Sequence, residues 1–521
     1  MHNLLGQLKH WTRLTPSRPF IYDGETVLTF VQCFDRALRF AGGLKALGLE
    51  KEARVAPIMF NGFRWYDLYY GLSAGGFVNV PLNFRLAGPE IAYQINDSQA
   101  QVVIMDPEFY EVIAQIKDMI PSVLHFVYTG EAPPPFDGAI SYDTLLAAES
   151  YEASGGDEND LFGIYYTGGT TGLAKGVMLT HKNIISNAFH LTATMGLGTD
   201  QLALHSAPMF HLADGAINFA ITMGGGAHVL VKAFEPKAVL NAISRYKATV
   251  TLWVPTMINM LVNHPQIADF DLSSLRLVFY GASPISPDLL RKASQALKCD
   301  FTQLYGMTEA GPILTILLPQ DHRRALSDPS QQYLLRAGGR QIIGVDVRVV
   351  DQNGKDVATG EIGEVIARGD NITRGYWNKP QETTNALIDG WYWSKDLGRI
   401  DEERYLYIVD RAKDMIISGG ENVYSVEVEN ALMSHPDVLE VAVIGVPNKE
   451  WGEAVTAVVV LKPGTSATAE QLREFCKQRI AGYKVPKAVT FMDALPKSGA
   501  GKIMKKDLRE IYWKGVDRRV S

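Results

Sequence analysis

The chain has 521 residues, of which 46% are hydrophobic and 21% charged, and its net charge is −7. The length predicts two to four domains or subdomains, and the composition is typical of a globular protein. The modest charge, without a Lys/Arg block before the C-terminus, gives no sign of nucleic-acid binding. The three cysteines lie far apart, which argues against a disulfide framework or a CxxC metal site and favours a cytoplasmic location.

The N-terminal residues lack the apolar core and cleavage site of a signal peptide. The most apolar segment, Gly215 to Val231, contains three consecutive glycines and His228. It is too short and too interrupted to cross a membrane, which needs about 20 apolar residues. We therefore expect buried sheet and turn there and no transmembrane segment, while peripheral membrane contact stays open.

In chain order, the first ~400 residues alternate apolar runs with amphipathic stretches, which is typical of an α/β fold. Thr29 to Leu47 is predicted to be a helix, because Thr29 and Gln32 have capping-box spacing and Gly48 follows as a stop. Strands are predicted at 55–59, 102–105 and 277–281, the last leading into a helix near Ser286. Ligands in open α/β sheets bind beyond the carboxyl ends of such strands.

The pattern changes near residue 340, where short strands at 345–350, 363–367 and 405–409 indicate a small β-rich section. From about Arg411 onward an α+β unit is predicted, with a helix after Ser425, strands at 438–446 and 455–461, and a helix over 469–480. We therefore place a domain boundary near residues 410–414, which divides the chain into 1–410 and 411–521.

A loop rich in glycine and threonine lies between two strand-like runs. It contains Thr167, Gly168, Gly169, Thr170, Thr171, Gly172 and Lys175. Accessible backbone N–H groups, hydroxyl donors and a cation together suit phosphate oxygens. A P-loop would instead end in Gly-Lys-Ser/Thr at the start of a helix, whereas Lys175 precedes Gly176 and a strand. Taken alone, a flexible surface hairpin is the commoner explanation of such a loop.

Together with further motifs, this loop resembles the adenylate-forming superfamily, in particular its acyl-CoA synthetases. The other motifs are Tyr305-Gly306-Met307-Thr308-Glu309, the surroundings of Asp396, the segment 410–423, and Pro496 to Lys502. They follow one another along essentially the whole chain. The resemblance implies a large N-terminal domain of two doubly wound sheets plus a small β-barrel, with a smaller, mobile α+β C-terminal domain.

The resemblance implies an acid–thiol ligase that joins a carboxylate to the α-phosphate of ATP and then transfers the acyl group to coenzyme A. Glu309 would bind Mg²⁺, Thr308 would bind the α-phosphate, and Tyr305 would stack on adenine. The implied ATP-binding residues are the seven loop residues above with Gly281, Ala282, Ser283, Tyr305, Gly306, Met307, Thr308, Glu309, Asp396, Arg411 and Lys502, and the implied catalytic residues are Thr167, Lys175, Glu309 and Lys502.

By resemblance, Asp396 accepts hydrogen bonds from the ribose hydroxyls and Arg411 contacts ribose or phosphate. Relatives usually have glycine before this aspartate, where this chain has Lys395, so the local loop geometry is in question. Asp410 also replaces a glycine common in relatives, and the sequence assigns it no role.

Lys502 is implied to reach the carboxylate and the α-phosphate from the mobile domain, which would rotate about a hinge at Lys413. After rotation, the segment Gly419, Gly420 and Glu421 would approach the acyl-adenylate for attack by the thiol. Trp451, Tyr483 and Lys484 are further candidates for coenzyme A contact, for which simple packing is an equal explanation.

His211 resembles the residue that gates the acid pocket in acyl-CoA synthetases, with Trp253 and Met307 as further lining. No charged residue stands at these positions, which favours an apolar acid: a medium- or long-chain fatty acid first, an arylcarboxylate second. Alternatives stay open: a ligase that loads a carrier protein, a luciferase-like oxygenase and an inactive ligand-binding relative. The expected partners are the small-molecule acid, ATP and coenzyme A, and a homodimer stays open.

Overall fold

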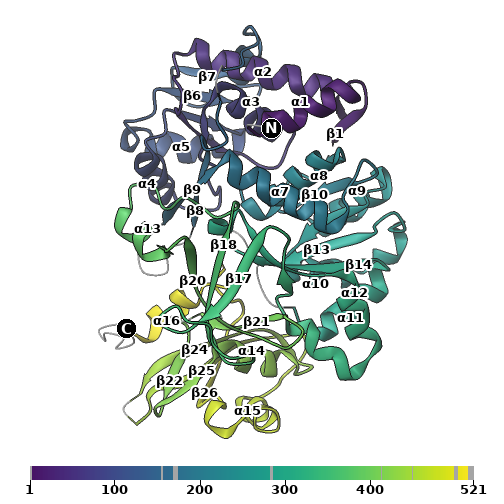
Figure 1. Cartoon of the computed structure of the whole chain (residues 1–521), viewed down its shortest axis with the longest axis vertical. Helices are drawn as coiled ribbons and strands as arrows, with labels where there is room; N and C mark the ends of the chain where they lie inside the picture. The colour runs from purple at the N-terminus through teal and green to yellow at the C-terminus, as the bar shows by residue number, and fades with distance from the viewer. Residues whose placement is uncertain are drawn as a thin grey trace.

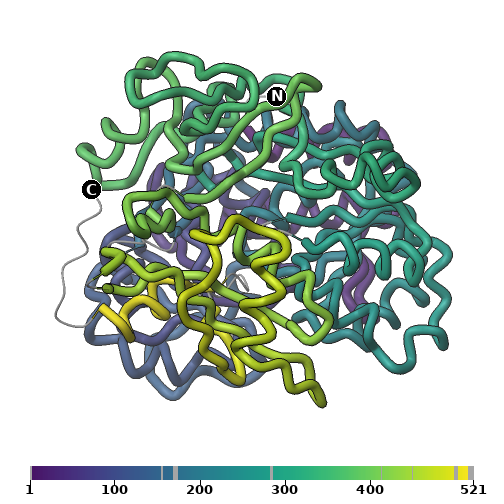
Figure 2. Tube along the Cα trace, turned by 90° about the horizontal axis from the view of Figure 1, so that it is seen from below, coloured from purple at the N-terminus to yellow at the C-terminus, as the bar shows by residue number. Residues whose placement is uncertain are grey.

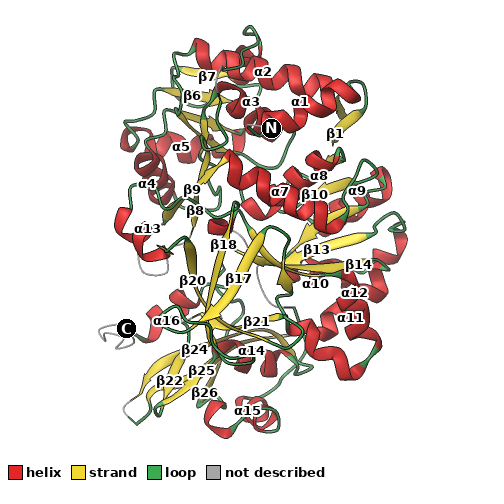
Figure 3. Ribbon diagram, viewed as in Figure 1, coloured by secondary structure: helices red, strands yellow, loops and turns green. Residues whose placement is uncertain are grey.

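The computed structural model describes residues 3–153, 156–167, 174–281, 285–411, 413–448, 450–497 and 503–513. Figure 1 shows the N-terminal helices at the top, long strands in the middle and a smaller α/β unit at the bottom. The fold is α/β, with helices packed around the sheets of the N-terminal part (Figure 3).

The largest sheet has the strand order β16-β15-β14-β13-β12-β10-β11-β1-β2. Its central strands are parallel and apolar, as expected where helices cover both faces. The strands are β1 (Pro19–Asp23), β2 (Thr26–Thr29), β10 (Leu202–His205), β11 (Ala227–Leu230), β12 (Val250–Trp253), β13 (Leu277–Gly281), β14 (Asp300–Gly306), β15 (Ile313–Leu317) and β16 (Arg340–Gln341), and the helices between them include α8 (Leu212–Gly224), α9 (Pro236–Tyr246), α10 (Pro255–Val262), α11 (Pro287–Leu297) and α12 (Pro319–Ser327).

The second sheet has the order β7-β6-β5-β3-β4-β8-β9 and is parallel except for the β8–β9 hairpin. Its strands are β3 (Arg54–Ile58), β4 (Val78–Asn79), β5 (Val102–Met105), β6 (His125–Tyr128), β7 (Ala139–Ser141), β8 (Leu161–Thr167) and β9 (Lys175–Thr180). The helices of this part are α1 (Leu5–Leu14), α2 (Phe30–Ala46), α3 (Arg64–Gly75), α4 (Gly88–Ser98), α5 (Tyr110–Ile116), α6 (Tyr142–Leu146) and α7 (His181–Met195).

A half-barrel sheet follows, and then the C-terminal unit. The half-barrel comprises β17 (Val345–Val350), β18 (Gly363–Gly369), β19 (Leu387–Ile388), β20 (Trp391–Ile400) and β21 (Leu406–Arg411), with α13 (Pro380–Ala386). The C-terminal unit comprises β22 (Ile416–Ser418), β23 (Glu421–Val423), β24 (Val438–Asn448), β25 (Gly452–Leu461) and β26 (Ala488–Phe491), with α14 (Ser425–Met433), α15 (Ala469–Lys477) and α16 (Lys505–Tyr512). Seen from below, it lies in front of the rest of the chain (Figure 2).

The expectation of sheet and turn over Gly215 to Val231 was wrong for most of that segment. Residues up to Gly224 belong to helix α8, and only β11 is a strand. Helix α8 is buried along almost its whole length, so it lacks the polar face that gives a helix its 3.6-residue period in a sequence. Within the described ranges, no helix has the length and apolar character needed to cross a membrane.

Candidate active site

The motif from Tyr305 to Glu309 lies at the carboxyl end of β14, where two glycines allow close approach of the backbone. A Cβ on Gly306 would lie 1.9 Å from the carbonyl oxygen of Pro312, and one on Gly281 would lie 2.4 Å from that of Leu304. Neither position can hold another residue without a backbone shift. The ends of β13 and β14 therefore lie side by side, at the edge where ligands of α/β sheets collect.

Tyr305 and Arg411 hold the carboxylate of Asp396 from two sides. The Tyr305 hydroxyl donates to Oδ2 at 2.8 Å, and Nε of Arg411 lies 3.3 Å from Oδ1. Asp396 and Arg411 are paired across β20 and β21, and the aspartate is only 7% exposed. The arrangement fixes one carboxylate at the end of β14 beside a cation, which suits a ligand that carries both hydroxyl groups and phosphates.

Lys395 takes a left-handed backbone conformation, with φ of 61°. This is the region that glycine enters without steric cost, and glycine is the residue that the resemblance led us to expect here. The Lys395 amide donates to Oε1 of Glu364 at 2.9 Å, which anchors the strained residue. Lys395 thus takes a conformation that suits glycine, and the backbone bends directly before Asp396.

Glu309 and Lys175 meet at the ring of Tyr376. The Tyr376 hydroxyl donates to Oε1 of Glu309 at 3.0 Å, and Nζ of Lys175 lies 5.2 Å from the centre of the ring. Burial raises the pKa of Glu309, and the hydrogen bond from Tyr376 opposes that rise. Backbone bonds from Met178 to Gly375 and from Trp377 to Gly176 attach this segment to β9. The tyrosine thus joins the half-barrel to the hairpin of the predicted phosphate loop.

No group of three or more His, Cys, Asp or Glu side chains that could hold a metal occurs in the described part of the chain. A protein-only metal cage is therefore not found there. A single buried carboxylate such as Glu309 fits Mg²⁺, which keeps waters and takes its other ligands from substrate phosphates.

Several predicted residues lie outside the described residues: Gly168, Gly169, Thr170, Thr171, Gly172, Ala282, Ser283 and Lys502. Thr167 ends β8 and is paired with Lys175 across the hairpin. Met307 and Thr308 follow β14 directly, at the turn that carries Glu309. Lys175, at the start of β9, and Glu309, in the turn after β14, both contact Tyr376. The β8–β9 hairpin and this turn therefore lie close together.

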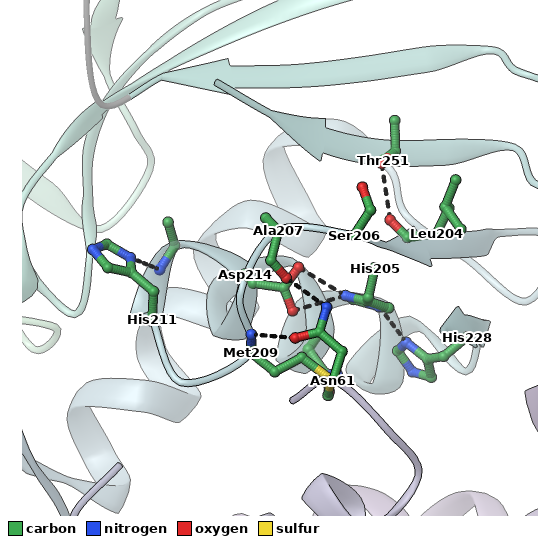
Figure 4. A network of polar contacts seen from close by, with 12 residues as sticks. Asn61, Leu204, His205, Ser206, Ala207, Met209, His211, Asp214, His228 and Thr251 are labelled. Atoms are coloured by element: carbon green, nitrogen blue, oxygen red, sulfur yellow. Dashed lines mark hydrogen bonds and ion pairs between the residues drawn. The ribbon is translucent and has the colours of Figure 1, made fainter. Parts of the chain in front are cut away.

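The loop before α8 carries His211, and Asn61 clamps this loop from the other sheet (Figure 4). Nδ2 of Asn61 donates to the carbonyl of Ala207 at 2.9 Å, and Oδ1 accepts from the amide of Met209 at 2.9 Å. Tyr69 on α3 also donates to the Met209 carbonyl, at 2.7 Å. His211 itself caps α8, accepting from the amide of Ala213 through Nδ1.

A fully buried polar chain lies behind this loop. Nδ1 of His205 donates to Asp214 at 2.9 Å, and Nε2 of His205 lies 2.9 Å from Nδ1 of His228 (Figure 4). Thr222 lies 3.0 Å from the other nitrogen of His228. Burial, with the neighbouring His205, holds the pKa of His228 well below its usual range. The chain ties β10 and β11 to α8 and so fixes both ends of the loop.

The other two predicted acid-pocket residues occupy different environments. Trp253 is fully buried, and its indole donates to the hydroxyl of Ser206 at 3.1 Å, at the start of the same loop. Met307 is partly buried and packs against two separate parts of the hydrophobic core. Their contact with an acid stays a prediction.

Gly419 and Gly420 form the tight turn between β22 and β23, with φ of 63° and 86°. Two such residues are typical of a two-residue hairpin, and Glu421 begins the next strand. Trp451 lies against the turn, since its carbonyl accepts from the amide of Gly419 at 2.8 Å. Lys487 lies 4.5 Å above the indole ring.

The remaining residues predicted to contact coenzyme A or to form the hinge lie in the following surroundings. Tyr483 is 41% exposed, and Nζ of Lys484 pairs with Glu427 at 2.7 Å. Lys413 follows β21, and burial lowers its pKa to about 8. Their roles in coenzyme A binding and hinge motion stay predictions.

Comparison with known proteins identifies the family. The AMP-binding enzyme family matches residues 8–377, and the AMP-binding enzyme C-terminal domain matches residues 427–502. The chain belongs to the AMP-binding enzyme family. It is 37% identical to a feruloyl-CoA synthase of Amycolatopsis sp over 511 residues, covering 96% of this chain and 97% of that protein.

Two further proteins that are similar to this chain are named for different acids. A long-chain-fatty-acid–CoA ligase of Mycobacterium tuberculosis is 36% identical over 494 residues, covering 93% of each protein. The crystal structure of an anthranilate CoA ligase in complex with anthranoyl-AMP has a TM-score of 0.88 at 26% identity, covering 98% of this chain and 97% of that one. Together they support an AMP-forming acid–CoA ligase that uses ATP and coenzyme A.

In this ligase, Tyr376 and Asn61 hold parts of the candidate site, and the sequence did not reveal them. Tyr376 lies 67 positions from Glu309, and Asn61 lies 148 positions from Met209. Neither contact belongs to a local pattern. The one available signal for Asn61 was its place three residues after the end of the apolar strand β3, at the sheet edge where ligands collect.

Proposed function

We propose that the ligase activates a hydrophobic monocarboxylic acid, and that Lys502, Lys175 and Arg411 offset the negative charges in the first step. An acid oxygen attacks the α-phosphorus of ATP, the bond to the β-phosphate breaks, and pyrophosphate leaves. The thiol sulfur of coenzyme A then attacks the acyl carbon, AMP leaves, and the thiol proton passes to solvent.

The observation that supports this proposal most directly is a pair of carboxylates at the carboxyl end of β14, those of Asp396 and Glu309. Tyr305 holds Asp396, and four residues later Glu309 is held by Tyr376 beside Lys175. One carboxylate suits ribose hydroxyls, and the other suits a metal on the phosphates. Mg²⁺ bound by Glu309 and phosphate oxygens would supply charge neutralisation when present.

Two acid classes each have one specific support. An arylalkenoic acid is favoured by the feruloyl-CoA synthase relative, and a medium- or long-chain fatty acid by the Mycobacterium tuberculosis relative. The loop that precedes α8 presents Met209 and Phe210 to the core, and both are buried, which agrees with an apolar acid of either class.

The test is AMP and pyrophosphate release over a panel of ferulate, cinnamate, octanoate, dodecanoate and palmitate, with and without coenzyme A. We expect AMP release that depends on coenzyme A, with kcat/KM for one class at least about tenfold above the other. Activity that appears only with an acyl carrier protein as thiol would favour the carrier-loading alternative. Absence of acid-dependent pyrophosphate release with every acid would contradict the proposal.

A further inference from the structure

Asp410 is a buried carboxylate on the last strand of the half-barrel. It lies on β21, paired in register with Leu397 of β20, and is 2% exposed. Its position therefore belongs to the body of the molecule, on the N-terminal side of Lys413. A carboxylate in such a place is costly unless hydrogen bonds satisfy it.

Two of the bonds that satisfy Asp410 come from the other side of Lys413. Oδ2 accepts from the backbone amide of Ser425, and Oδ1 accepts from the Ser425 hydroxyl at 3.0 Å. Ser425 is the first residue of α14, the first helix of the C-terminal unit. A third bond comes from the amide of Arg411, at 2.8 Å. The carboxylate thus links the half-barrel directly to α14.

The contact extends to the helix that follows Lys502. Nζ of Lys505, on α16, donates to the Ser425 hydroxyl at 2.6 Å and pairs with Glu429 at 2.7 Å. Four residues on, Arg509 pairs with Asp414 at 2.7 Å. Helix α16 is therefore tied by two ion pairs to the start of the C-terminal unit, at the place where Asp410 holds it.

We propose that Asp410 is a positioning residue, which holds the C-terminal unit in a pose that favours acyl-adenylate formation over thioester formation. The inference rests on the proposed function, in which Lys502 acts in the first step and the unit turns about Lys413. Rotation there moves Ser425 away from Asp410, so the contact stabilises one pose alone.

The link to the first step comes from the chain itself. Lys502 precedes Lys505 by three residues, and three residues of chain extend at most about 11 Å. Because Ser425 binds both Asp410 and Lys505, the contact limits how far Lys502 can lie from Asp410. The same carboxylate is adjacent in sequence to Arg411, which pairs with Asp396 of the nucleotide site. Asp410 thus couples the position of Lys502 to that site.

Two variants remove the contact from opposite sides. Asp410→Gly removes the carboxylate. Ser425→Pro removes both donors and suits the first position of a helix, and Tyr424 before it is extended, with φ of −82° and ψ of 117°. Lys506→Ala is the matched control, because Lys506 neighbours Lys505 but pairs with Glu510 at the surface.

The two half-reactions are measured separately, with ferulate and dodecanoate as probe acids. The first is acid-dependent ATP–pyrophosphate exchange, and the second is thioester formation from supplied acyl-adenylate and coenzyme A. We expect either variant to slow the first about tenfold and to leave the second within about twofold, as loss of a bond to a buried charge implies. The double variant should lose no more than the worse single one, since both act through one contact. Lys506→Ala should change neither rate.

Equal losses in both half-reactions, or unchanged rates in both, would overturn the inference. If Asp410→Gly does not fold, as judged by its thermal transition, Ser425→Pro alone decides. A wild-type enzyme that exchanges pyrophosphate normally while the variants lose both steps in parallel would refute the positioning role and leave the proposed function intact. A wild-type enzyme that forms no acyl-adenylate with any panel acid would refute both.

Discussion

The hydroxyl of Tyr305 donates to the carboxylate of Asp396 across 2.8 Å, although the residues lie 91 positions apart. Arg411 approaches the other carboxylate oxygen, so Asp396 is held from two sides. The half-barrel thereby contributes a fixed acceptor to the end of the largest sheet. This contact orients the group that we assign to ribose binding.

Tyr305→Phe removes that hydrogen bond and leaves the ring in place. We expect the KM for ATP to rise roughly five- to tenfold with a smaller change in kcat, since a bond to a charged group is worth about 1.5–3 kcal/mol and Arg411 still holds Asp396. Steady-state kinetics with varied ATP measures this. Tyr405→Phe is the matched control, because it removes a buried bond of 2.7 Å to Asp321 away from the site. An equal rise in both variants would contradict the assignment.

Tyr376→Phe should shift the pH dependence of the first half-reaction. Burial raises the pKa of Glu309, and the Tyr376 hydroxyl lowers it by stabilising the charged form. Without that hydroxyl the pKa rises further, so Glu309 loses its charge at a higher pH and Mg²⁺ binds more weakly in acid. We expect the acidic limb of kcat/KM to move up by roughly one pH unit.

The measurement is pyrophosphate release from pH 5 to 9 at fixed Mg²⁺, with Tyr142→Phe as the control. That variant removes a buried bond of 2.9 Å to Asp67, in another part of the fold. If the acidic limb of the kcat/KM profile stays in place or moves to lower pH in Tyr376→Phe, the Tyr376 hydroxyl does not lower the pKa of Glu309.

Local signals predicted the elements well, because their causes are local. The capping box at Thr29 and Gln32 is present, and α2 begins at Phe30. The strands at 102–105, 277–281 and 345–350 have the predicted bounds. Ser286 caps α11, as expected from its position. Helix α8 was missed because burial on all sides removes the helical period.

The site was only partly predictable for a related reason. Motif residues such as Tyr305 and Glu309 are recognisable because their spacing is local. Tyr376, which holds Glu309, and Asn61, which holds the loop before α8, act across long sequence separations and carry no spacing signal. The Asp410–Ser425 contact is also invisible in sequence, since it depends on how the C-terminal unit lies against β21.

Lys395 offers a direct test of backbone strain beside Asp396, in the candidate nucleotide site. Lys395→Gly should leave the free energy of unfolding unchanged or raise it by up to about 1 kcal/mol, because the left-handed conformation suits glycine. Lys395→Val should lower it by about 1–2 kcal/mol and raise the KM for ATP, because Asp396 follows directly. Urea unfolding and ATP kinetics measure the two effects.

Arg404→Val is the matched control, since Arg404 also has a left-handed φ, of 68°, in a turn before β21. It should lower stability without changing the KM for ATP. Equal effects of both valine variants on that KM would mean that Lys395 does not act through Asp396.

Asn61→Ala should alter use of the acid and leave ATP binding unchanged. It removes the bond to the carbonyl of Ala207 and leaves the buried amide of Met209 without its acceptor, at a cost of about 2 kcal/mol. We expect the KM for the acid to rise about fivefold or more while the KM for ATP stays within twofold. Asn218→Ala removes another buried bond, to Tyr66, and should lower stability alone. A rise in both KM values would mean that Asn61 does not act on the acid through the loop before α8.

The most direct test of the account follows the oxygen atoms of the acid. With ¹⁸O in both carboxylate oxygens of ferulate or dodecanoate, the ligase is turned over with ATP and coenzyme A, and the AMP and pyrophosphate are analysed by mass spectrometry. Attack on the α-phosphorus transfers one ¹⁸O to AMP and none to pyrophosphate, which is the predicted result. Unlabelled AMP, or release of ADP and phosphate in its place, would contradict an acyl-adenylate intermediate.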